Sequence, residues 1–177
     1  MHLKGSGPMI KQPNYPSSPT ETLPLLEPAH LFQAIAGRSS STSPLAGWAR
    51  ELGDMHAELI PFQLGDILRQ RNPAGEQIHA AIDRAVSEID AWAARNIPRM
   101  KGARTHTHTL GEVISRIAKI YAVTWWTVLH SADSETRHRA WFHLGEARES
   151  YAEMVDEIRW RHLQLPLGWT GICRGTE

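Results

Sequence analysis

Cysteine is nearly absent from this chain of 177 residues, because the sole cysteine is Cys173 near the C-terminal end. One thiol cannot form an internal disulfide, so nothing in the sequence indicates an oxidising compartment. The chain also lacks a run of about 18 apolar residues, which argues against a membrane-spanning helix. Residues 1–19 lack the apolar core of a secretory signal. We therefore expect a cytoplasmic protein, or one inside whatever particle carries it.

Net charge is absent as well, because 19 basic residues balance 19 acidic ones. This balance argues against a protein that binds nucleic acid by bulk electrostatics. Catalytic signatures are equally scarce. The sequence has no GxSxG motif and no phosphate-cradling glycine loop, and Cys173 has no histidine beside it. These absences lean against an enzyme, and we expect no cofactor.

Proline is concentrated at one end of the chain. Five of the eleven prolines precede residue 25, interspersed with Gly5, Gly7 and two serines. No regular element can begin in such a segment, so we expect residues 1–24 to form an extended or disordered N-terminal arm. A partner could still order this arm, but composition favours a free terminus.

Helical periodicity dominates the rest of the chain. A short helix is predicted near 28–37, opened by Pro28 and closed by Gly37. Four long helices follow, beginning near Pro44, residue 75, Thr109 and Asp133, and the last is expected to stop at Pro166. No segment alternates as a strand does. We predict an all-α protein, an antiparallel bundle of four long helices plus the short one, with a domain over 25–166 and a tail over 167–177.

The stretch RTHTHTLGE (104–112) permits two interpretations. His106, His108 and Glu112 could converge on a metal ion such as zinc, with His143 or His162 completing the site. Alternatively, Thr109 and Glu112 match a capping box at the start of a helix. The second interpretation is favoured because it explains both residues without a metal.

A basic loop precedes the same helix and contains no acidic residue between 91 and 111. Helix N-termini attract anions, and Gly111 would let a phosphate approach the backbone. The candidate ligands for a phosphorylated small molecule or nucleotide are Arg95, Arg99, Lys101, Arg104, Thr109, Gly111 and Arg116. The favoured alternative is a solvated loop, or one paired with acidic side chains of the last helix.

Carboxylates on the last predicted helix suggest a further site. Glu146, Glu149, Glu153 and Asp156 share one flank, as in helical pyrophosphohydrolases that bind magnesium. Arginines are interleaved on the same helix, so a mixed-charge solvent face is the favoured reading.

Tryptophan is abundant, with seven in the chain. Trp125 and Trp126 are adjacent, so one helix cannot bury both against the same neighbour. Trp141 and Trp160 lie beside the apolar seam of the last helix. These four form a candidate interaction surface for a protein partner or a second copy.

The segment ARTHTHTLGEVISRI resembles an actinobacterial family of unknown function, the domain-of-unknown-function family four-two-five-four. Thr107, Thr109, Gly111 and Arg116 match its pattern, whereas His108 replaces a glutamate and Ser115 an aspartate. Three upstream positions (Phe62, Asp66 and Arg69) are also similar, with Gly65 in place of an acid, as are EIDAW (88–92) and LQLP (163–166).

The resemblance spans about 45–166 and implies an all-helical fold from an actinobacterium or its phage, the protein lying within the infected cell or the particle. It supplies no activity and no catalytic residues. The leading hypothesis is therefore a non-catalytic helical protein, oligomeric, with a regulatory, adaptor or assembly role. The alternative is an enzyme or sensor for a phosphorylated ligand at 95–111, with a divalent metal as a weaker variant.

Overall fold

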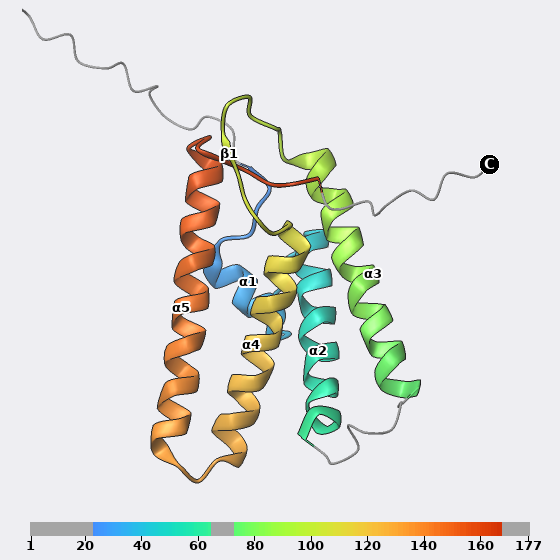
Figure 1. Ribbon diagram of the computed structural model, residues 1–177, viewed down its shortest axis with the longest axis vertical. Coiled ribbons are helices and arrows are strands. Elements are labelled where there is room, and N and C mark those ends of the chain that lie inside the picture. Colours follow the sequence, from blue (N-terminus) through green and yellow to red (C-terminus); the bar gives the residue numbers. More distant parts are fainter. Residues whose placement is uncertain (1–22, 65–72, 168–177) are drawn as a thin grey trace, which may run out of the picture.

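The computed structural model describes residues 23–64 and 73–167, and of residues 62–64 only the backbone. The predicted arm, except Leu23 and Pro24, and the tail beyond Leu167 lie outside this range. The described residues are predominantly helical, as expected (Figure 1). Their elements are α1 (Pro28–Ile35), α2 (Pro44–Leu64), α3 (Pro73–Asn96), β1 (Arg104–Thr105), α4 (Leu110–His130), α5 (Ser134–Arg159) and β2 (Leu163–Gln164).

Helix α4 occupies the centre of the fold. It packs against α2, α3 and α5, whereas the short α1 packs against α2 and α5. Consecutive long helices run in opposite directions (Figure 1). The core lies where these helices meet, and its most deeply buried side chains include Leu31, Leu45, Leu52, Ile89 and Ile114.

Helix α2 shows how the sequence pattern builds this core. Leu45, Leu52 and Leu59, seven residues apart, are each at most 2% exposed, and burying each contributes roughly 1.5–3 kcal/mol. Gly53 lies on the same helix, where a Cβ would come within 2.6 Å of the carbonyl oxygen of Ile35. The missing side chain therefore lets α1 lie directly against α2.

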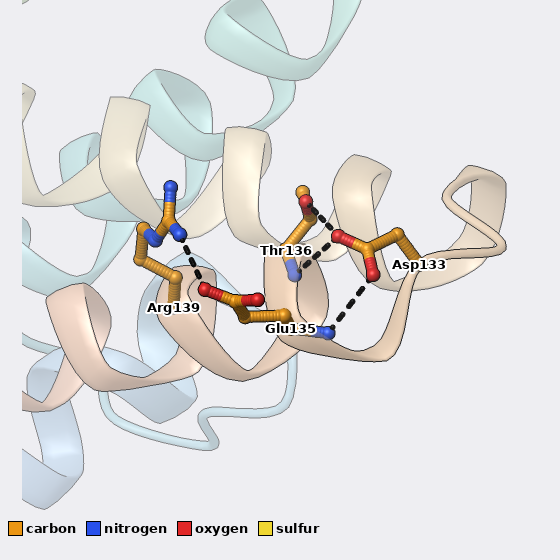
Figure 2. Close-up of polar contacts among 4 residues, drawn as sticks. All are labelled: Asp133, Glu135, Thr136 and Arg139. Atoms are coloured by element: carbon orange, nitrogen blue, oxygen red, sulfur yellow. Dashed lines mark hydrogen bonds and ion pairs between the residues drawn. The ribbon is translucent and has the colours of Figure 1, made fainter.

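Helix α5 begins with a capping carboxylate. Asp133 accepts hydrogen bonds from the amides of Glu135 (3.3 Å) and Thr136 (2.9 Å), and Glu135 pairs with Arg139 at 2.8 Å (Figure 2). The Thr136 hydroxyl also donates a hydrogen bond to Asp133. This bond lowers the pKa of Asp133 most, and the two amide bonds lower it further. The start predicted at Asp133 or Ser134 is therefore confirmed.

The end of α5 differs from the prediction. The helix stops at Arg159, and Arg161 adopts a left-handed conformation with φ of 62°. Beyond it, Leu163 and Gln164 form the strand β2, and Leu163 and Leu165, two positions apart, are both buried in the core. Leu163 pairs in parallel register with Arg104. The expectations of a helix to Pro166 and of no strand were wrong, since a two-residue strand carries no readable period.

Candidate functional site

The first turn of α4 contains the predicted capping box. The Thr109 hydroxyl accepts from the amide of Glu112 at 3.2 Å, and the Glu112 carboxylate accepts from the amide of Thr109 at 2.9 Å. The favoured interpretation of RTHTHTLGE is confirmed in this respect. Glu112 therefore has a structural role at the start of the helix.

The carboxylate of Asp90, a residue of α3, lies at the same helix N-terminus. Its carboxylate accepts a hydrogen bond of 2.8 Å from the amide of Gly111. Burial raises the pKa of Asp90, and its hydrogen bonds with Gly111 and Thr109 offset this only in part. No local pattern could identify this residue, because it lies 21 positions before Gly111.

Gly111 has a role other than the predicted one. A Cβ there would lie 2.5 Å from the carbonyl oxygen of Val86 and 2.9 Å from the Asp90 carboxylate. The glycine thus allows α3 to approach α4, and its surroundings are already filled by the chain. The expectation that Gly111 admits a phosphate to the backbone is corrected.

Several of the groups that the phosphate hypothesis assigned to the basic loop and the helix start are already bonded within the chain. The amides of Gly111 and Glu112 are already bonded within the chain. Arg104 pairs with Glu157 of α5 at 2.8 Å, which confirms for this residue the predicted pairing with the last helix. Arg95, Arg99 and Lys101 are exposed. The geometry therefore gives a phosphate no amide cradle here.

A cleft of about 310 Å³ lies between α4 and α5, and we call it the α4–α5 cleft. Its floor is apolar, formed by Val113, Ile117, Ile120, Ala147, Tyr151 and Met154. Its polar lining consists of Ser150 and six ionisable side chains: His106, His108, Glu112, Arg116, His143 and Glu146. The cleft thus joins the three proposed metal ligands with Arg116 and with residues of α5.

The imidazoles of the cleft are engaged locally. His106 Nδ1 lies 2.8 Å from the carbonyl oxygen of His108 and 3.1 Å from its amide nitrogen. His108 Nδ1 lies 3.0 Å from the Thr107 hydroxyl, and His143 Nδ1 lies 3.4 Å from a Glu146 carboxylate oxygen. Across the described residues, no group of three His, Cys, Asp or Glu side chains could hold a metal ion. The geometry lends no support to the metal hypotheses for His106, His108 and Glu112 or for the α5 carboxylates.

A second surface is formed mainly by aromatic side chains, and we call it the aromatic face. It consists of Tyr121, Trp125, Trp126 and Leu129 of α4 together with Trp141 of α5. Trp125 and Trp141 meet edge to face with ring centroids 6.3 Å apart, while they remain 41% and 47% exposed.

An apolar groove of about 180 Å³ continues the aromatic face onto α2. All members of the face except Trp141 line this groove, opposite Gly53, Ala57 and Ile60. Trp160 follows the last residue of α5, 19 residues beyond Trp141 and roughly 28 Å away along the helix direction. The prediction of one surface containing four tryptophans is corrected, because Trp160 lies at the other end of α5.

Within residues 23–64 and 73–167, no helix is both long and apolar enough to cross a membrane. Comparisons of the chain with protein family models, curated proteins and solved structures give no match.

Proposed function

We propose that this chain is a non-catalytic helical protein that acts through protein–protein contacts, as a regulatory, adaptor or assembly component. In this proposal the four long helices form an antiparallel bundle that presents the aromatic face, and α1 covers part of the space between α2 and α5. A distant relation to the domain-of-unknown-function family four-two-five-four belongs to the same proposal.

The observation that carries this function is the exposed pair Trp125 and Trp141. Two tryptophans in contact, each more than 40% exposed, expose apolar surface that binding would remove from water. Aromatic side chains are enriched at protein interfaces. The adjoining groove gives a partner's apolar side chain a place to insert.

A second copy of the chain is the partner that we propose. Under twofold symmetry the same patch of both copies meets, so apolar surface is buried against apolar surface. The groove shares no lining residue with the α4–α5 cleft.

The test is light scattering on the full chain at several concentrations, with Trp141→Gln compared with Trp160→Gln. Both tryptophans are exposed on or next to α5 (47% and 56%), so the two variants lose similar surface. We expect a dimer for the wild type and for Trp160→Gln. Trp141→Gln should shift the equilibrium toward monomer by about tenfold or more. A wild-type monomer at all concentrations would contradict the proposal.

A further inference from the structure

Helix α1 packs between α2 and α5 along only part of their length. Figure 1 shows both long helices extending beyond α1 toward the turn between α4 and α5. Gly53 of α2 lies against the carbonyl oxygen of Ile35, and it also lines the apolar groove between α2 and α4. The groove therefore adjoins the contact with α1. A surface continuous with the one that binds α1 has a suitable shape for a second helix.

One flank of α5 joins the part of this helix that holds α1 to the aromatic face. Arg159 pairs with Glu27, the residue immediately before α1. Residues seven or four positions apart on a helix share a flank. Going back along α5 from Arg159 in such steps, the residues on this flank are Ala152, Gly145 and Trp141. The flank that contacts the segment before α1 therefore leads to the exposed tryptophan.

Gly145 lies inside α5, although glycine is the poorest helix former after proline. At Gly53 and Gly111 a Cβ would come within 3 Å of a carbonyl oxygen of a neighbouring helix, which explains both glycines. At Gly145 a Cβ would meet nothing within 4 Å among the described residues. Glycine in a helix commonly permits close approach of another backbone, and no described part of this chain makes that approach at Gly145.

We propose that α5 of a second copy packs against α5 at Gly145 and places its Trp141 in the groove between α2 and α4. This inference rests on the proposed function, because it specifies how the second copy binds the aromatic face. Among the described residues seven large hydrophobic side chains are exposed, and four of them lie on or beside this face: Trp125, Leu129, Trp141 and Phe142. The second copy therefore offers its own α5 as the matching apolar surface.

Twofold symmetry gives Gly145 a defined place in this contact. A residue near the axis of such a contact meets the same residue of the other copy. Two helices that cross at glycine approach to the lower end of the usual range of about 8–10 Å between axes. Trp141 and Phe142, one turn away on α5, then lose their contact with water on both copies.

The first test compares Gly145→Leu with Gly47→Leu by light scattering on the full chain at several concentrations. Gly47 is the matched control, because it is an exposed helical glycine of α2 whose Cβ would also meet nothing within 4 Å in the described chain. Leucine favours a helix more than glycine does, so both monomers should stay folded by circular dichroism. Gly145→Leu should weaken the dimer about tenfold or more, because its side chain separates the crossing helices. Gly47→Leu should keep the wild-type equilibrium.

A disulfide gives the second test, in a Cys173→Ser background that removes the native thiol. Two cysteines form a disulfide only when their Cα atoms lie within about 7 Å. Gly145→Cys should therefore link two copies on mild oxidation, whereas Gly47→Cys should stay unlinked.

The outcomes separate this inference from the proposed function. A wild-type chain that is monomeric at all concentrations overturns both. A wild-type dimer that Trp141→Gln weakens and Gly145→Leu leaves intact overturns the packing at Gly145 alone. Failure of Gly145→Cys to link the copies of such a dimer overturns it as well.

Discussion

At the scale of single residues, two glycines show what the absence of a side chain does in this fold. Gly53 and Gly111 lie on helices, where glycine costs roughly 1 kcal/mol relative to alanine. At each position a Cβ would come within 3 Å of a carbonyl oxygen of a neighbouring helix, so this cost is offset by close packing. Gly145 of α5 differs, because a Cβ there would meet nothing within 4 Å.

The first prediction follows from this contrast. Gly111→Ala should lower the free energy of unfolding by about 1–3 kcal/mol, since the new methyl group forces α3 away from α4. Gly145→Ala should raise it by roughly 0.5–1 kcal/mol through helix propensity alone. Urea unfolding of both variants measures the two changes. A neutral Gly111→Ala would show that the contact with Val86 and Asp90 yields easily.

At the scale of elements, His56 connects α2 to α4. His56 Nε2 lies 3.0 Å from the Ser115 hydroxyl. Burial lowers the pKa of His56 to about 4, with contributions from the positive charges of Lys119 and His79. Burial between the two helices therefore favours the neutral imidazole of His56.

A pH dependence follows with a definite sign. Between pH of about 6.5 and about 4, the unfolded chain binds a proton that native His56 does not. The stabilisation that neutral His56 contributes is therefore fully present above about pH 6.5, and it is lost as the pH falls through this window. A shift of this size, discounted for partial exposure, corresponds to about 2 kcal/mol.

Urea unfolding across this pH window measures the effect. His56→Gln should remove most of the slope, because glutamine does not titrate. His138→Gln replaces an exposed histidine of α5 and should keep the wild-type slope. Identical slopes for both variants would mean that other groups cause the acid loss of stability.

The elements also show which features a sequence reveals. The starts of α1, α2 and α4 were predictable because Pro28, Pro44 and the Thr109 capping box act within one helical turn. The pairing of β1 with β2 was not, since two residues carry no period and the contact joins positions 59 apart. The same limit applies to Asp90, because its partner Gly111 is close in space but 21 positions away in the sequence.

The candidate site was predictable in part for the same reason. His106, His108, Glu112 and Arg116 belong to one segment, so their proximity was expected, and all four line the α4–α5 cleft. The residues of α5 that complete the cleft depend on the register between two helices. That register is set by contacts such as the Thr124 hydroxyl donating to the carbonyl oxygen of Ala140 at 3.2 Å, which no pattern in the sequence reveals.

At the scale of the whole molecule, the segment before α1 is fastened to α5. The Tyr151 hydroxyl donates to the carbonyl oxygen of Leu26 at 2.9 Å, across 125 positions of sequence, and Arg159 pairs with Glu27. Burial raises the pKa of Tyr151, so its hydroxyl stays protonated and remains a donor near neutral pH. These contacts hold α1 against the rest of the core.

Tyr151→Phe should therefore destabilise the fold without leaving a cavity in the core. The ring is retained, but the carbonyl oxygen of Leu26 loses its donor, at a cost of about 1–2 kcal/mol. Hydrogen exchange should report this loss most strongly at the amide of Leu31, which donates to the carbonyl oxygen of Glu27 at 2.9 Å. Helix α1 packs mainly against α2 and α5, so exchange rates of amides in the middle of α3 should change only with global stability.

Tyr121→Phe is the matched control, because Tyr121 stacks on Trp125 at 6.4 Å between ring centroids and keeps this contact as phenylalanine. It should change the free energy of unfolding by less than about 0.5 kcal/mol. An equal loss in both variants would show that the aromatic rings, rather than the bond to Leu26, determine the stability. A loss confined to Tyr151→Phe, with faster exchange in α1, would show that one hydroxyl joins the first helix to the last.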